Sequence, residues 1–270
     1  MTATADTLRV GPLLRAWRRR RRLSQLDLAL EAGVSARHLS FVETGRSRPS
    51  AGMVLSLAEQ LDVPLRDRNQ LLLAAGHAPV FEERELDEPA MEPVRATLRM
   101  ILDGHDPYPA VVIDRSWELI AANSAVALLT AGVAPELLEP PVNVLRLSLH
   151  PAGVAPRIAN LGEWRAHLLE RLQRQIALTG DPALATLHEE IAGYTAPEIA
   201  RQPDAGPVND IAVPLRLRAG EGELAFISTV ATFGTAVEVT ASELSIESFF
   251  PADRATADAV RAYAERSAAA

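Results

Sequence analysis

The chain has 270 residues, which suits two domains of ordinary size, and 48% of them are apolar, enough for a sizeable core. It contains no cysteine, which excludes disulfides, thiolate zinc sites and cysteine nucleophiles and fits a reducing cytosol. The net charge of −8 is unevenly distributed along the chain. Arginine outnumbers acidic residues in 1–80, whereas the remainder is strongly acidic. Such an asymmetry is expected for a DNA-binding domain joined to a domain of a different kind.

Neither a leader nor a membrane span is expected. The first residues lack the apolar segment of a signal peptide. The longest apolar runs, such as 225–233, fall well short of the ~20 residues that cross a bilayer. We therefore expect a cytoplasmic protein with no membrane partner.

The first predicted helix spans 9–22 and ends in a run of arginines. Leu13, Leu14 and Trp17 supply its apolar side. Cations suit the C-terminal end of a helix dipole, so the run 18–22 is either a solvated helix end or a set of phosphate contacts. Glu43, further along, has the wrong charge for phosphate, and we expect it to pair within the domain, for example with one of these arginines.

The stretch 24–44, SQLDLALEAGVSARHLSFVET, reads as two short helices joined by a tight turn. Ser24 and Asp27 form a capping box for the first helix, and Ser35 caps the second. Gly33 lies where the first helix must end in an open or left-handed conformation. Counted from the residue after Ser24, alanine is fifth, glycine ninth, and aliphatic residues are fourth, tenth, fifteenth and eighteenth, which is the spacing of a DNA-binding helix-turn-helix.

The exposed side of the second helix predicts how this motif reads DNA. The start of a recognition helix meets base edges in the major groove, so Arg37 is the candidate for a bidentate contact to guanine. Phe41 either touches a thymine methyl group or packs inside the domain, and for each of the others the alternative is an ordinary surface side chain. The predicted DNA-binding residues are Gln25, Ser35, Ala36, Arg37, His38, Ser40, Phe41, Arg46 and Arg48, with Gln25, Arg46 and Arg48 assigned to phosphates.

Two further helices complete the first domain. One is expected over 51–61, and another begins at Pro64 and ends at Gly76. Five helices within 1–80 predict an all-α bundle around one core. The following residues, 81–93, are acidic and proline-rich, which predicts an exposed linker.

Residues 94–270 predict a second, α+β domain. Short apolar runs separated by turn signals predict two strands near its start and three near its end, which together make one five-stranded antiparallel sheet packed by helices. The predicted strands are 110–114, 117–122, 211–218, 223–232 and 236–249, and the predicted helices are 90–103, 123–129, 143–149, 161–178, 181–191 and 253–266.

The residues that could suggest an enzyme do not have the spacing that known catalytic motifs require. His188 and Glu189 are not followed by the second histidine that a zinc-binding helix needs, because position 192 is alanine. Gly220 and Gly222 imitate a dinucleotide-binding loop, but they lead into a strand-like run and predict a hairpin turn. The six histidines are scattered. We therefore expect no enzyme activity, no metal and no cofactor.

The motif and its surroundings resemble known regulators. Residues 25–50 resemble the phage-repressor-like XRE family, down to LSQLDLALEAGVS and ETGRSRPS. The chain is further similar to MmyB-like regulators in RHLSFVETGRSRPS, in 68–79, in PYPAVVIDRSWELIAAN, in NVLRLSLHP and in the helix around Trp164. The resemblance covers most of the chain. It implies a helix-turn-helix domain followed by a PAS-like domain that binds a small apolar ligand such as a fatty acid, with ligand-modulated transcription as the output.

A ligand with a polar head group needs a polar partner in the second domain. Arg146, His150 and Arg165 lie in or next to helices with apolar partners, so one of them is a candidate to hold a carboxylate, and Asn123 closes the WELIAAN strand. The alternatives are surface charge or intradomain pairing for the three cations, and a cap of the next helix for Asn123.

Two other functions stay open for the second domain. It is either a dimerisation or partner-protein platform without ligand, or an enzyme acting on a small molecule beside an autoregulatory head. A core without a cavity favours the first, and converging histidines and carboxylates favour the second. We expect a homodimer bound to double-stranded DNA, because such proteins usually pair to read two half-sites.

Overall fold

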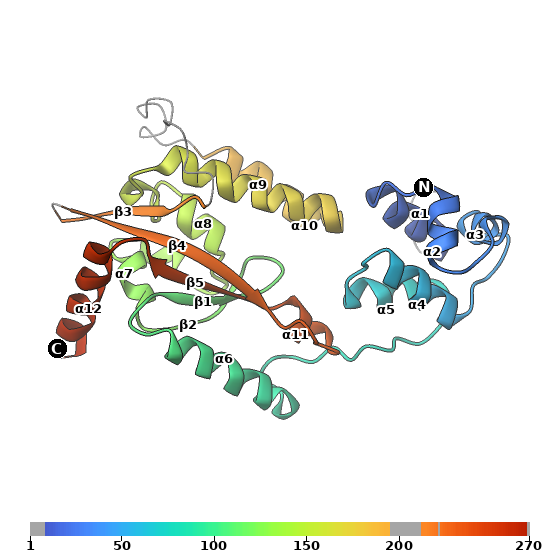
Figure 1. Cartoon of the computed structure of the whole chain (residues 1–270), viewed down its shortest axis with the longest axis horizontal. Helices are drawn as coiled ribbons and strands as arrows, with labels where there is room; N and C mark the ends of the chain where they lie inside the picture. Colours follow the sequence, from blue (N-terminus) through green and yellow to red (C-terminus); the bar gives the residue numbers. More distant parts are fainter. Residues whose placement is uncertain (1–8, 195–211, 221, 269–270) are drawn as a thin grey trace. The chain divides into compact units, whose positions relative to one another are not determined.

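The computed structural model describes residues 9–194, 212–220 and 222–268 (Figure 1). The chain divides into two compact units. One comprises the residues up to Glu88 together with Gly234–Ser242, and the other comprises Pro89–Phe233 and Glu243–Ala270. The segment Gly234–Ser242 therefore belongs to the first unit, although it connects two strands of the second.

The first unit is a bundle of helices (Figure 1), and its buried side chains form one apolar core. Its helices in the described residues are α1 (Val10–Arg20), α2 (Gln25–Glu31), α3 (Ala36–Glu43), α4 (Ala51–Gln60) and α5 (Leu65–Ala74). Leu14, Leu28 and Leu39, one each from α1, α2 and α3, are fully buried. Gly11 allows α1 to approach α3 closely, because a Cβ atom there would lie 2.6 Å from the carbonyl oxygen of Val42. The predicted five-helix bundle is confirmed.

Local signals in the sequence explain the α2–α3 corner. The Ser24 hydroxyl accepts from the backbone of Asp27, whose carboxylate accepts from the Ser24 backbone in return, so the predicted capping box is present. The Ser35 hydroxyl accepts from His38 N at 3.1 Å. Gly33 has φ +65°, the left-handed conformation that ends α2.

The second unit is built on one five-stranded antiparallel sheet in the order β2-β1-β5-β4-β3. Its strands are β1 (Ala110–Ile113), β2 (Leu119–Ala122), β3 (Leu215–Ala219), β4 (Gly222–Thr232) and β5 (Ser245–Pro251). The helices from residue 89 on are η1 (Pro89–Met91), α6 (Glu92–Gly104), α7 (Val126–Thr130), η2 (Pro135–Leu137), α8 (Val144–Leu149), η3 (Ala155–Arg157), α9 (Leu161–Thr179), α10 (Pro182–Ala192), α11 (Val239–Glu243) and α12 (Arg254–Ala268). The α+β class with one antiparallel sheet is confirmed, and its PAS-like character stays a prediction.

The last predicted strand, 236–249, is wrong in its first half. That half forms the short helix α11, and β5 begins only at Ser245. The Glu238 carboxylate accepts from Ala241 N at 2.7 Å and so caps the first turn of α11. This cap favours a helical turn over an extended chain, and the alternating pattern of apolar residues did not reveal it. Position 211, the start of another predicted strand, lies outside the described residues.

One face of the sheet and several helices surround the core of the second unit. Val111 lies opposite Glu247 in the β1–β5 register, and Phe249 follows two residues later, so the three side chains share a face. Residues of α7, α8 and α9, such as Leu129 and Trp164, belong to the same apolar cluster. This face carries the cavity described below.

Candidate functional site

α3 presents an arginine away from the core of the first unit. Leu39 and Val42 are completely buried on its inner side, whereas Arg37 is exposed. The guanidinium carbon of Arg37 lies 5.5 Å from the ring centroid of half-buried Phe41, a cation–π contact that steadies it. Ser35, the N-cap of α3, is also exposed, whereas Ala36, His38 and Ser40 are half-buried. Arg37 therefore faces away from the protein interior, whereas Ala36 packs against the core of the first unit.

A buried ion pair joins α1 to α3. Nε and Nη2 of Arg18 donate to the two carboxylate oxygens of Glu43 at 2.6 and 2.8 Å, and Gln25 Nε2 adds a bond of 2.8 Å from α2. The expected pairing of Glu43 with an arginine of the first helix is thus confirmed. Burial raises the pKa of Glu43, but the hydrogen bonds from Arg18 and Gln25 outweigh it and hold this pKa below its usual value.

The three predicted phosphate contacts have different surroundings. The Gln25 amide is engaged with Glu43, and Arg48 Nε donates to the carbonyl oxygen of Ala75 at 2.8 Å. Arg46 is exposed, and its side chain has no partner in the described part of the chain. Of the three, Arg46 is therefore the side chain most available to a phosphate, and all three assignments stay predictions.

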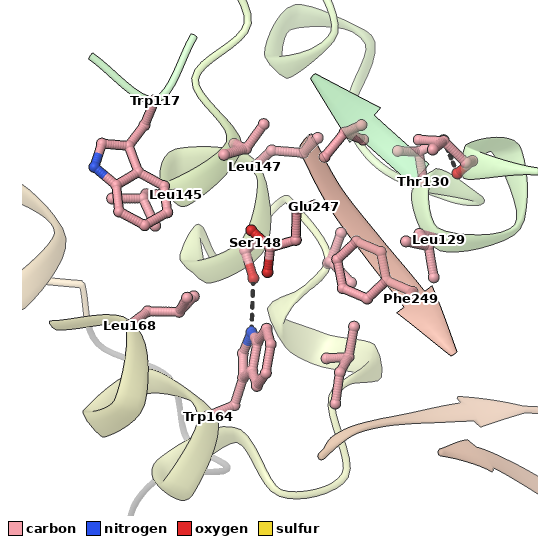
Figure 2. A pocket seen from close by; sticks show the side chains of 15 residues that line it. Trp117, Leu129, Thr130, Leu145, Leu147, Ser148, Trp164, Leu168, Glu247 and Phe249 are labelled. Carbon is pink, nitrogen blue, oxygen red and sulfur yellow. Dashed lines mark hydrogen bonds between the residues drawn. The ribbon is translucent and has the colours of Figure 1, made fainter. Parts of the chain in front are cut away.

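The second unit contains an apolar cavity of about 90 Å³ (Figure 2). Its walls come from the sheet and from α7, α8 and α9. The lining residues are Val111, Trp117, Val126, Leu129, Thr130, Val144, Leu145, Leu147, Ser148, Val154, Trp164, Leu168, Leu215, Glu247 and Phe249. Such a cavity, apolar with a few placed polar groups, is typical of small-molecule sites.

The polar groups of the cavity are mostly held by neighbours. The Ser148 hydroxyl accepts from Trp164 Nε1 at 3.0 Å, the contact drawn in Figure 2. Thr130 Oγ1 donates to the carbonyl oxygen of Val126 at 3.2 Å. Glu247 accepts from Arg171 Nη1 at 3.0 Å. Within the described lining, Glu247 is the one charged side chain.

The four predicted ligand residues are not among those that line the cavity. Asn123 accepts from Ala110 N at 3.0 Å and donates to the carbonyl oxygen of Tyr108 at 2.8 Å, so it joins the end of β2 to the start of β1. Arg165 Nη2 donates to the carbonyl oxygen of Ala192 at 2.5 Å, whereas its Nε is buried without a partner in the described chain.

The other two belong to a polar cluster around Glu190. Arg146 binds both carboxylate oxygens of Glu190 at 2.7 Å, and Tyr194 donates to the same carboxylate. The Arg146 bond first of all lowers the pKa of Glu190, and burial together with the Glu190 bond raises the pKa of Tyr194 to about 12. His150 packs edge-on against Tyr194 with ring centroids 5.0 Å apart. Their ligand roles stay predictions that the cavity lining does not support.

Sequence reasoning missed Glu247 as a cavity residue. An acidic residue in a strand is usually solvent-exposed, and nothing in its type marks it as buried. One signal was available, because Glu247 and Phe249 alternate within β5 and so share a face with the apolar core.

The described residues hold neither a membrane-spanning helix nor a metal-binding cluster. No helix there combines the length and apolar character that a membrane span needs. No group of histidine and acidic side chains there is arranged to bind a metal ion.

Comparison with known families gives two matches. A model described as the MmyB-like transcription regulator ligand binding domain matches residues 94–262, which hold the cavity. A helix-turn-helix model matches residues 14–67, which include α2 and α3. No curated protein matches the chain.

Proposed function

Since the chain belongs to the MmyB-like transcription regulators and carries an XRE-type helix-turn-helix, we propose that α3 reads a specific DNA sequence and that a small apolar ligand in the cavity changes this binding. The broader statement, a DNA-binding transcription regulator with a ligand-binding domain, follows from the two family matches. The observation that supports the DNA-reading part of this proposal is the exposure of Arg37 on α3 over Phe41, and the apolar cavity supports the ligand part. We further propose a cytoplasmic homodimer that reads two half-sites.

The cavity favours ligand binding over the alternatives. A second domain that served only as a dimerisation or partner platform would have no need of an apolar cavity of about 90 Å³. Catalysis by paired acid and base groups is disfavoured, because Glu247 stands alone as a titratable side chain among the described lining residues, and neither matched family is an enzyme family. The apolar lining is compatible with part of an alkyl chain.

β5 offers a path from the ligand to the DNA-binding unit. Glu247 and Phe249 lie on β5, which directly follows α11. The residues around α11 hold the chain just before η1 by three hydrogen bonds, Val239 N to Glu82 O at 2.9 Å, Arg84 N to Glu238 Oε1 at 2.9 Å and Thr240 Oγ1 to Arg84 O at 2.7 Å. We propose that a shift of β5 on ligand entry changes these bonds and with them the attachment of the DNA-binding helices.

Substitutions in the first unit test the DNA assignment. Arg37→Ala is expected to lower affinity for the selected operator about 10- to 100-fold and to change affinity for random DNA little, because it removes a base contact. Arg46→Ala is expected to weaken binding to all sequences and to lower the salt slope by about one, because it removes a phosphate contact. Salt titrations of binding to operator and random duplexes measure both, and equal effects of the two changes would show that the roles are misassigned.

Removal of the Glu238 carboxylate tests the path through β5. Glu238→Ala is expected to leave ligand affinity and basal operator affinity within about twofold of wild type while abolishing the ligand-induced change in operator affinity. Glu136→Ala, an exposed glutamate on η2, is the matched control and should keep the full response. A Glu238→Ala protein that responds to ligand as wild type does would exclude this path.

A further inference from the structure

One carboxylate oxygen of Glu247 lacks a partner at the cavity. The side chain is 8% exposed, and Figure 2 shows its carboxylate turned toward the interior of the cavity. Oε2 accepts from Arg171, whereas Oε1 accepts no hydrogen bond in the described part of the chain. Oε1 is not among the fully buried unpartnered atoms, so it is accessible from the cavity, and a ligand that supplies a hydrogen-bond donor can reach it there.

Arg171 is held outside the cavity and is not one of its lining residues. Its guanidinium carbon lies 4.5 Å from the centroid of the Trp117 ring, a close cation–π contact. The Trp117 indole is itself fixed, because its Nε1 donates to Gln175 at 2.7 Å. This stack keeps the positive charge behind Glu247 and disfavours its turning inward to meet an anion.

Ser148 adds a second polar function to the lining. Its oxygen accepts from Trp164 Nε1, and no described residue takes the hydrogen that the hydroxyl can donate. The cavity therefore offers one charged acceptor and one hydroxyl among aliphatic and aromatic walls.

From this arrangement we infer that the ligand's polar end is a hydrogen-bond donor, an alcohol hydroxyl or a protonated amine, which binds Glu247 Oε1. In an alcohol, the oxygen also accepts from Ser148. A carboxylate is disfavoured, because two negative charges would meet in a poorly hydrated space and Oε1 would still lack a donor. The inference rests on the ligand-sensing function proposed above and specifies the ligand class.

The size of the cavity limits what it encloses. Its volume of about 90 Å³ is smaller than the engineered cavity of about 150 Å³ that takes benzene. The enclosed part of the ligand is therefore a polar end with a few carbon atoms. Short-chain probes are the appropriate test compounds.

The test compares three ligands of equal chain length on the purified full-length protein. Hexan-1-ol, hexylamine and hexanoate are titrated, with binding followed by saturation-transfer NMR and by the fluorescence of Trp117 and Trp164 in the cavity wall. Both donor ligands are expected to bind at least about tenfold more tightly than hexanoate.

Glu247→Gln provides the second arm, because it keeps the shape of the side chain and removes its negative charge. The substitution is expected to weaken the binding of hexylamine and to strengthen the binding of hexanoate. The two affinities should then lie within about twofold of each other. Glu136→Gln, an exposed change on η2, should preserve the wild-type ranking. Thermal unfolding shows whether each variant is folded, and if Glu247→Gln does not fold, the wild-type ranking decides alone.

The outcomes separate this inference from the function beneath it. Hexanoate binding as tightly as the two donors would overturn the inference and leave ligand sensing in place. Failure of all three probes to bind the folded protein would overturn the inference and the sensing function together.

Discussion

Replacing Glu43 with alanine is expected to lower the free energy of unfolding of the first unit by about 3–5 kcal/mol. The Glu43 side chain is 1% exposed, so its removal leaves the buried Arg18 guanidinium and the half-buried Gln25 amide without this acceptor. Because domains are stable by only about 5–15 kcal/mol, the loss should unfold a measurable fraction of the DNA-binding helices. Hydrogen exchange of peptides from α1, α2 and α3 measures it directly.

Two controls give this result its meaning. Glu59→Ala changes an exposed glutamate on α4 and is expected to cost less than about 0.5 kcal/mol. The double change Arg18→Met with Glu43→Leu replaces the pair by apolar side chains and is expected to recover much of the loss. A Glu43→Ala protein as stable as Glu59→Ala would show that the ion pair contributes nothing to the bundle.

The Arg18–Glu43 ion pair predicts that the free energy of unfolding of the first unit depends on pH. The pKa of Glu43 in the folded state lies below its ordinary value of 4.5, so its stabilisation is complete above that value and is lost as pH falls through the lower, folded-state pKa. The difference in unfolding free energy between wild type and Glu43→Ala is therefore constant near neutral pH and shrinks in acid, below about pH 4.5. A difference that grows as the pH falls would contradict this direction.

Filling the cavity is expected to abolish ligand binding. Val126 and Val144 are half-buried lining residues on α7 and α8, and changing both to phenylalanine adds much of two rings to a space of about 90 Å³. Affinity for hexan-1-ol is expected to fall about 100-fold or more, at an overpacking cost of about 1–3 kcal/mol per site. Basal operator affinity is expected to stay within about twofold of wild type.

Calorimetric titration and operator binding of the same preparations check this. Val80→Phe, the same change at a position in the first unit that is 58% exposed, is the control and should bind ligand as wild type does. Unchanged ligand affinity in the doubly substituted protein, folded by its thermal unfolding curve, would mean that the ligand binds elsewhere.

The DNA-binding unit was predictable because its signals are local. A cap at Ser24, a left-handed residue at Gly33 and buried aliphatic residues at helical spacing each act within a few positions of the chain. The Arg18–Glu43 pair spans 25 positions, but charge alone excluded a phosphate contact for Glu43 and left pairing within the domain as the natural role.

The cavity was less predictable because its residues meet only through the tertiary fold. Arg146 was a reasonable partner for an anion until its pairing with Glu190, 44 positions away, was known. Glu247 became a lining residue through its strand register and through contact with Arg171, 76 positions away. The helix at 239–243 was not predicted, because the alternating pattern of these residues also suits a strand.

The most direct test of the account is the affinity of the full-length protein for its selected operator, measured with and without saturating hexan-1-ol. Ligand in the cavity is expected to change that affinity by about fivefold or more, and the filled-cavity variant is expected to show no change. An operator affinity that stays constant while NMR reports an occupied cavity would contradict ligand-modulated DNA binding.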